Sequence, residues 1–129
     1  MSPTAEERLE MFVNISNHPS PKWGPEQLAA AVALGGTVRD IAFPNVPPAA
    51  DFAAVDLLAD SLIEGISAGD VVMVQGEAAL CFAATRKLLA KGARVVVAST
   101  ERRSVETTNP DGTVTKTAVF GFVIFREII

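Results

Sequence analysis

The sequence predicts an α/β fold, a small Rossmann-like three-layer sandwich with a mostly parallel sheet and a C-terminal β-hairpin. Short apolar runs alternate with helical patterns, an order typical of parallel sheets with right-handed crossovers. Two of these runs, residues 71–75 and 94–98, are apolar on both faces, as central strands are when helices cover both sides. The turn composition Asn-Pro-Asp-Gly at 109–112 predicts the hairpin.

The chain begins with a predicted strand and helix. Residues 11–16 are a short β-prone run, and the polar, proline-containing residues 17–24 follow it as a loop. Pro25 suits a first helical position and Glu26 a positively polarised helix N-terminus. The glycine pair at 35–36 ends the pattern, so we expect a helix of about ten residues.

A second strand and helix come next. Residues 37–43 form a strand candidate, and the prolines of 44–48 prevent it from continuing. Asp51 is a good N-cap for the helix that follows. Apolar residues at alternating spacings of three and four place one stripe on this helix: Phe52, Val55, Ala59, Leu62 and Ile66.

The second half of the chain completes the alternation. The strand at 71–75 leads into a helix over 78–91, and the strand at 94–98 follows it. The hairpin strands are predicted at 102–108 and 114–125.

Length and composition fit a single domain. The chain has 129 residues, 49% of them hydrophobic. We expect residues 1–10 to be a flexible N-terminal extension and residues 11–129 to be the domain. The first ten residues contain no apolar signal-peptide core, and no apolar run approaches the roughly 20 residues of a membrane span, so we expect a cytoplasmic protein without a membrane partner.

Charge and cysteine content exclude several classes of function. The net charge of −4 disfavours binding to duplex nucleic acid. One cysteine and one histidine cannot supply a disulfide or a zinc site, so we expect neither a metal nor a cofactor. Residues 77–103, however, contain six basic and two acidic residues, a local charge of +4 that could hold a small anionic ligand.

Polar residues follow the predicted strands at the sheet edge where parallel sheets bind ligands. They are Ser16, Asn17, His18, Asn45, Gln75, Gly76, Glu77, Ser99, Thr100, Glu101 and Arg102. Neither the GxGxxG nor the GxxxxGK[ST] phosphate-binding pattern occurs among them.

Several of these residues have two interpretations. His18 is the only residue of the type whose unperturbed side-chain pKa lies near neutrality, and it is either a general acid or base or a loop histidine bonded to backbone. Lys22 and Trp23 could meet a phosphate and a base, although a tryptophan at that position could also pack on its own helix. Cys81 lies in an apolar helical stripe, so we expect it in the core.

The glycine and the charged run have two interpretations as well. Gly76 either lets backbone approach a phosphate at a helix N-terminus or makes a tight turn, with Glu77 capping the helix. The run at 99–103 combines two hydroxyls, a carboxylate and two guanidinium groups. It is either a phosphate grip or an exposed ion-pair ladder.

Five segments resemble a known family. MFVNISNHPSPKW, FPNVPP, VMVQGEAAL, ASTERRSVE and VFGFVIFREI are similar to segments of small CRISPR-associated proteins with a CARF-like, Rossmann-type fold, a group that includes ring nucleases. The resemblance implies a homodimer that binds cyclic oligoadenylate, the second messenger of type III CRISPR defence. It places around the messenger Ser16, Asn17, His18, Gly76, Glu77, Thr100, Glu101 and Arg102.

Three functions follow for testing. The first is a ring nuclease that cleaves the messenger by metal-independent attack of a ribose 2′-OH, with His18 as acid or base and Arg102 or Lys22 steadying the phosphate. The second is a sponge or sensor that binds the ring without cleaving it. The third is an unrelated Rossmann-like enzyme or interaction module that uses a mononucleotide.

Overall fold

A computed structural model describes residues 10–129, so all but the last residue of the expected N-terminal extension lies outside the described residues. The fold is α/β, as predicted, and is built on a five-stranded sheet of order β2-β1-β3-β4-β5. The first four strands in this order pair in parallel, and β4 and β5 pair antiparallel. The strands are β1 (Met11–Ser16), β2 (Thr37–Ala42), β3 (Val71–Val74), β4 (Arg94–Thr108) and β5 (Val114–Ile128).

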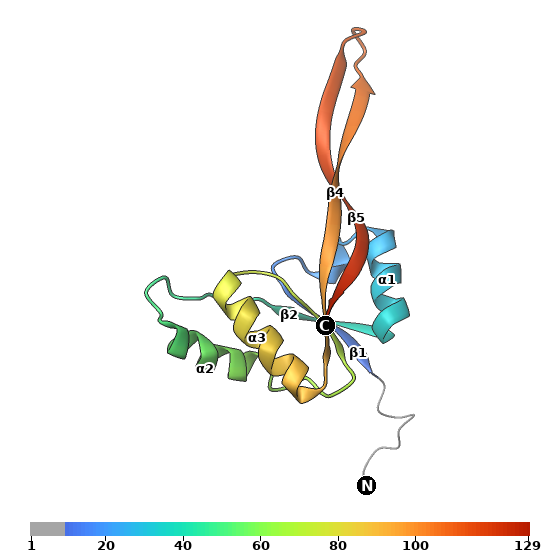
Figure 1. Ribbon diagram of the computed structural model, residues 1–129. Coiled ribbons are helices and arrows are strands. Elements are labelled where there is room, and N and C mark those ends of the chain that lie inside the picture. Colours follow the sequence, from blue (N-terminus) through green and yellow to red (C-terminus); the bar gives the residue numbers. More distant parts are fainter. Residues whose placement is uncertain (1–9) are drawn as a thin grey trace.

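Helices cover both faces of the sheet (Figure 1). They are α1 (Pro25–Gly35), α2 (Phe52–Leu62) and α3 (Ala78–Lys91), with a short 3-10 turn, η1 (Ser20–Lys22). Side chains alternate along β1, so Phe12 packs in the core on the α1 side and Val13 in the core beneath α2 and α3. The result is the predicted three-layer arrangement. No helix in the described part of the chain is long and apolar enough to cross a membrane.

The helix termini follow their sequence signals. Pro25 occupies the first turn of α1, and the Asp51 side chain accepts a hydrogen bond from the Ala54 N–H at the start of α2. Gly92 ends α3 in the left-handed conformation, with φ 92°.

Close approach of α1 to β1 depends on Gly35. A Cβ atom at this position would lie 2.5 Å from the backbone nitrogen of Phe12, and neither backbone segment can move without disturbing the core. We therefore expect Gly35→Ala to lower the free energy of unfolding, measured by urea denaturation, by at least about 1–3 kcal/mol. Gly65→Ala is the control, because its nearest neighbour would lie 3.7 Å away, and it should change stability by less than about 1 kcal/mol. Equal stability of the two variants would contradict this account of the helix–strand contact.

Predicted boundaries were wrong in the C-terminal hairpin and in the second helix. Residues 99–101 were expected in a loop between a fourth strand and the hairpin, but β4 runs through them without interruption. They pair with β5, and the register shifts at a bulge between Ser99 and Thr100. An exposed two-stranded ribbon has solvent on both faces, so its polar residues look like a loop in the sequence. β5 also extends beyond the expected end at 125, to Ile128.

The second error concerns α2, which ends at Leu62 and not at Ile66. Ile63 caps the helix, and the Ile66 N–H donates to the Ile63 carbonyl at 3.0 Å in a turn. Both isoleucines are buried in the core, so the apolar spacing continues beyond the end of the helix.

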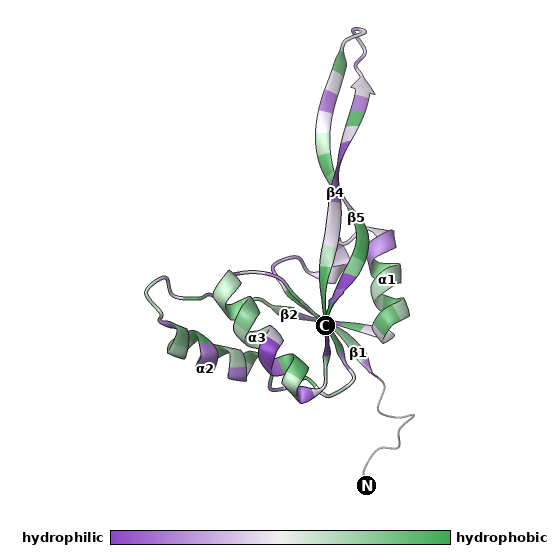
Figure 2. Cartoon of the chain, viewed as in Figure 1, coloured by the Kyte–Doolittle hydropathy of each residue, from purple (hydrophilic) through white to green (hydrophobic). Residues whose placement is uncertain are grey.

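Beyond the bulge, β4 and β5 leave the sheet as a ribbon that projects from the body (Figure 1). We call residues 100–122 the arm. Hydrophobic and hydrophilic residues alternate along it, without a fully polar surface (Figure 2).

Candidate functional site

A cavity of about 590 Å³ lies at the carboxyl ends of β1 and β3 and beside the middle of β4, between the start of α1 and the base of the arm. We call it the site cavity. The segment after β1 contributes Ser16, His18, Lys22, Trp23, Gly24, Pro25, Glu26 and Gln27. The sheet and arm contribute Met73, Gln75, Ala98, Thr100, Arg103, Phe120, Gly121 and Phe122.

A guanidinium group from the arm reaches this cavity. Arg103 Nε donates to Glu101 Oε1 at 2.7 Å, and its terminal nitrogen lies 3.5 Å from the Phe122 carbonyl oxygen. The guanidinium crosses Gly121, where a Cβ atom would lie 2.6 Å from Arg103 Cζ. A residue without a side chain at 121 is therefore needed for the guanidinium to occupy this position.

Aromatic rings form much of the cavity wall. Trp23 packs edge-on against Phe12 at 6.1 Å and lies 6.2 Å from Phe125, and its Nε1 donates to the His18 carbonyl at 2.9 Å. Trp23 is thus held in place by the body of the protein. Phe122 also packs on Phe125, at 4.8 Å, whereas Phe120 is 76% exposed.

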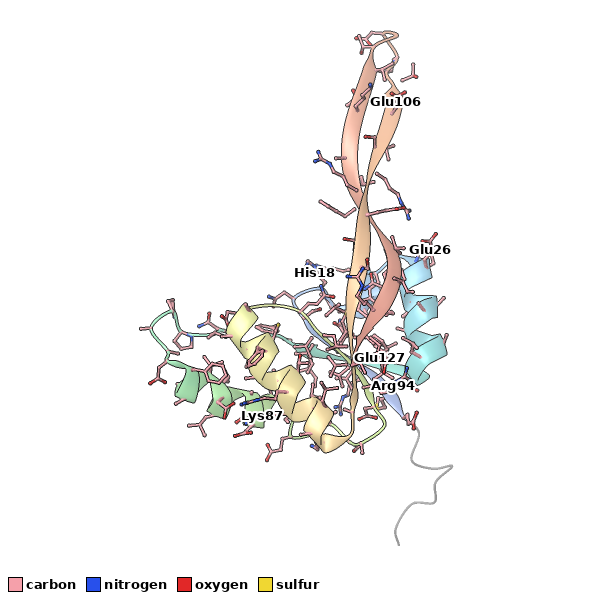
Figure 3. All side chains as sticks on the ribbon, viewed as in Figure 1. His18, Glu26, Lys87, Arg94, Glu106 and Glu127 are labelled. Carbon is pink, nitrogen blue, oxygen red and sulfur yellow. The ribbon has the colours of Figure 1, made fainter. Side chains whose placement is uncertain are left out.

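A buried amide fixes the loop that carries His18. Asn14 is only 1% exposed, and its Nδ2 donates to the His18 carbonyl at 2.9 Å and to Asp40 Oδ1 at 2.8 Å. Its Oδ1 accepts a hydrogen bond from the Ser16 hydroxyl at 2.7 Å. The backbone of His18 is therefore anchored, while its imidazole lines the site cavity near the point where β4 leaves the sheet (Figure 3).

The carboxylate of Asp40 completes this network. It accepts hydrogen bonds from the Ser20 hydroxyl at 2.7 Å and from the Ser20 N–H at 3.0 Å. Partial burial raises the pKa of Asp40, but the hydrogen bonds from Ser20 and Asn14 outweigh it and hold the pKa below its ordinary value.

We expect Asp40→Ala to lower the free energy of unfolding by on the order of 1 kcal/mol at neutral pH, because it removes these hydrogen bonds. A lowered folded pKa means that the carboxylate stabilises the fold above its ordinary pKa of 3.8, and that this contribution is lost as the pH falls through the folded pKa. The difference between wild type and variant in chemical denaturation should therefore shrink as the solution becomes more acidic than pH 3.8. Asp60→Ala, which removes only an exposed ion pair, is the control. A difference that grows on acidification would contradict this assignment.

Predicted site residues on the other side of β1 gather around a second pocket of about 370 Å³. Its lining includes Asn17, Phe43, Asn45 and Glu77. Glu77 caps α3, since its carboxylate accepts from the N–H groups of Ala79 and Leu80 at 3.0 and 2.9 Å. This carboxylate takes the place that an anion would occupy at the helix N-terminus.

Gly76 has a packing role beside this pocket. A Cβ atom at 76 would lie 2.5 Å from the ring of Phe43, so the glycine makes room for that ring. The sequence offered a tight turn with Glu77 capping the helix as the alternative to phosphate contact, and of these features the structure shows the cap by Glu77.

The basic segment at 77–103 is largely neutralised away from the site cavity. Arg86 and Lys87 on α3 form ion pairs with Asp56 of α2 at 3.1 Å, and Lys87 also pairs with Asp60 at 2.8 Å. Arg94 pairs with Glu127 at 2.6 Å (Figure 3). Arg103 is likewise paired with Glu101 at 2.7 Å, so among residues 10–129 the basic residues of this segment without an ion pair are Lys91 and Arg102.

Of the predicted site residues, the structure brings together Ser16, His18, Lys22 and Thr100 in the site cavity. Arg102 is not among the lining residues; it pairs across the ribbon with Phe120, while its neighbour Arg103 reaches the cavity. Sequence reasoning did not single out Arg103 or the wall residues Glu26, Phe120 and Phe122. The register places Arg102 opposite Phe120, which lines the cavity, and Arg103 opposite Val119, which does not. Arg103 reaches the cavity because its side chain crosses Gly121, a contact that no sequence pattern indicates.

Cys81 is partly buried and packs against the core beneath α3, as predicted. Burial raises the pKa of its thiol. Among residues 10–129, no group of three or more His, Cys, Asp or Glu side chains is arranged to hold a metal ion.

Comparison with known proteins gives one match. The model of the Uncharacterized protein MJ1673 family matches residues 10–126, which is nearly the whole described chain. No curated protein and no solved structure was found to match. The chain therefore belongs to the MJ1673 family.

Proposed function

We propose that the site cavity binds a nucleotide through its phosphate and base, and that the ligand is cyclic oligoadenylate. The observation that carries this proposal is the meeting of two cationic side chains, Lys22 and Arg103, with the aromatic rings of Trp23, Phe120 and Phe122 in one cavity. Cations and aromatic faces together are the groups that proteins use for single-stranded nucleic acids.

The cationic groups suit a phosphate. A guanidinium can donate two parallel hydrogen bonds to phosphate oxygens, and a lysine adds a point charge. Lys22 comes from the end of η1 and Arg103 from β4, so the two cations approach the cavity from different elements. Glu101 holds Arg103 Nε and the Phe122 carbonyl oxygen lies 3.5 Å from Nη2, which leaves Nη1 as the guanidinium nitrogen that faces a phosphate.

The remaining wall suits a nucleoside. The exposed ring of Phe120 offers a surface for stacking a base. Gln75 and Thr100 provide groups that can bond ribose hydroxyls or the edge of a base, whereas the Ser16 hydroxyl is already bonded to Asn14. The cavity volume falls within the roughly 300–1,000 Å³ of small-molecule sites, so part of a ring lies inside and the rest extends along the arm.

The same site could cleave the ring. A ribose 2′-OH attacks the adjacent phosphorus, the bond to the 5′ oxygen breaks, and a 2′,3′-cyclic phosphate and a 5′-OH form. In this route His18 accepts the proton of the 2′-OH or donates one to the leaving 5′ oxygen. Lys22 and Arg103 stabilise the charge that develops on the phosphate.

Trp23 allows binding to be measured directly, because it is the single tryptophan of the chain and lines the site cavity. We expect its fluorescence to change and saturate on titration with cyclic oligoadenylate, and to change less with AMP at equal concentration. Saturation with AMP alone would favour the third function, an unrelated Rossmann-like protein that uses a mononucleotide. No change with either compound, together with no heat of binding, would refute nucleotide binding at this cavity.

A further inference from the structure

The arm and the adjoining residues 123–124 of β5 expose apolar side chains. Val119, Phe120, Val123 and Ile124 of β5 are 40%, 76%, 51% and 57% exposed. They lie within residues 117–125, nine successive uncharged residues on the outermost strand of the sheet. Edge strands of monomeric proteins usually carry charges or prolines that prevent further pairing.

The arm is also poorly supported by the body. Past the bulge, β4 and β5 continue to pair as far as Thr108 and Val114 with no third strand. An isolated two-stranded ribbon is marginally stable in water unless another strand or helix packs on it.

We propose that a second copy of this chain occupies this edge, with the two β5 strands paired antiparallel about a two-fold axis. A strand that pairs antiparallel with its own copy makes the same contact in both directions, so the assembly closes at two chains. The inference does not depend on the nucleotide proposed above.

Charge favours a second copy at the arm. Residues 100–122 carry three acidic and three basic side chains, a net charge of zero, whereas the whole chain carries −4, so the remaining residues also sum to −4. The charged residues of the arm are Glu101, Arg102, Arg103, Glu106, Asp111 and Lys116. Two bodies of like charge repel, and the arms are where two copies can meet with balanced charge.

The area is adequate for a dimer. The exposed apolar side chains of the arm and its edge, with Val105 and Val114 included, total on the order of 500 Å² over the two faces of the ribbon. Main chain and polar side chains of the paired strands bring the contact toward the roughly 800 Å² per partner of a stable complex.

The site cavity would be affected by this pairing. Phe120 and Phe122 belong both to the edge strand and to the cavity wall. A second copy along β5 therefore lies at the rim of each cavity, and the two cavities of the dimer face a common region.

Sedimentation velocity over a concentration series tests the association. We expect wild type to be a dimer and Val119→Lys/Val123→Lys to raise the dimer dissociation constant by at least about a hundredfold, because four ammonium groups would meet at one interface. Neither valine lines the site cavity. Leu57→Lys, at a 69% exposed position on α2, is the matched control and should remain dimeric.

Amide hydrogen exchange locates the interface without a substitution. In wild type, exchange of residues 114–124 should slow as protein concentration rises, and exchange in α2 should not. A monomer at every concentration would overturn the proposal. So would a dimer whose added protection from exchange lies outside residues 114–124. A double lysine variant that circular dichroism shows to be folded and that still forms the dimer would also overturn it.

Discussion

Replacing His18 with alanine is expected to lower the single-turnover rate of ring cleavage by about 10²–10⁴-fold, the usual contribution of a positioned acid or base. Binding should be retained, because the carbonyl of His18, and not its imidazole, holds the loop through Asn14 and Trp23. Alanine keeps that carbonyl and removes only the group that transfers a proton.

The control for this prediction is His18→Gln, which keeps a polar side chain but cannot titrate near neutrality. It should lose as much activity as the alanine variant. Both reactions are run with EDTA present, since attack by the 2′-OH needs no metal. Unchanged cleavage in both variants would mean that His18 transfers no proton and that catalysis comes from positioning of the 2′-OH by Ser16 or Thr100. Tight binding without cleavage by excess wild-type protein would make the protein a sponge or sensor.

Replacing Arg103 with alanine is expected to weaken binding of cyclic oligoadenylate by roughly ten- to a hundredfold, the effect of losing a charge-assisted hydrogen bond to phosphate. Arg102→Ala is the matched control, because it removes the same side chain from the next residue of β4, outside the cavity lining. Its dissociation constant should change little.

A second substitution tests the position of the guanidinium. Gly121→Ala places a methyl group where Arg103 crosses the ribbon, so it should weaken binding in the same direction although it removes no charge. If Arg102→Ala weakens binding and Arg103→Ala does not, the arginine assignment from sequence holds and the one from structure fails.

Much of the fold could be predicted because its signals are local. Pro25, Asp51 and Gly92 mark helix termini through backbone chemistry that does not depend on distant residues. The errors occurred where tertiary contacts determine the end of a helix or strand. Burial of Ile66 continued the apolar stripe after α2 had ended, and pairing with β5 turned the polar residues at 99–101 into strand.

The candidate site was only partly predictable for the same reason. Strand ends identify which loops share an edge, and this placed Ser16, His18 and Thr100 together. It cannot tell which side of the sheet each loop residue faces, so Asn17 and Glu77 were grouped with them but lie at the second pocket. Arg103 reaches the cavity because its side chain crosses Gly121, although the register pairs Arg102 with the lining residue Phe120, and no local pattern specifies that crossing.

Calorimetric titration of the wild-type protein with cyclic oligoadenylate tests the central claim most directly. The account predicts saturable binding that Arg103→Ala weakens and Arg102→Ala leaves nearly unchanged. Absence of any heat with folded wild-type protein, or equal binding by all three proteins, would contradict it.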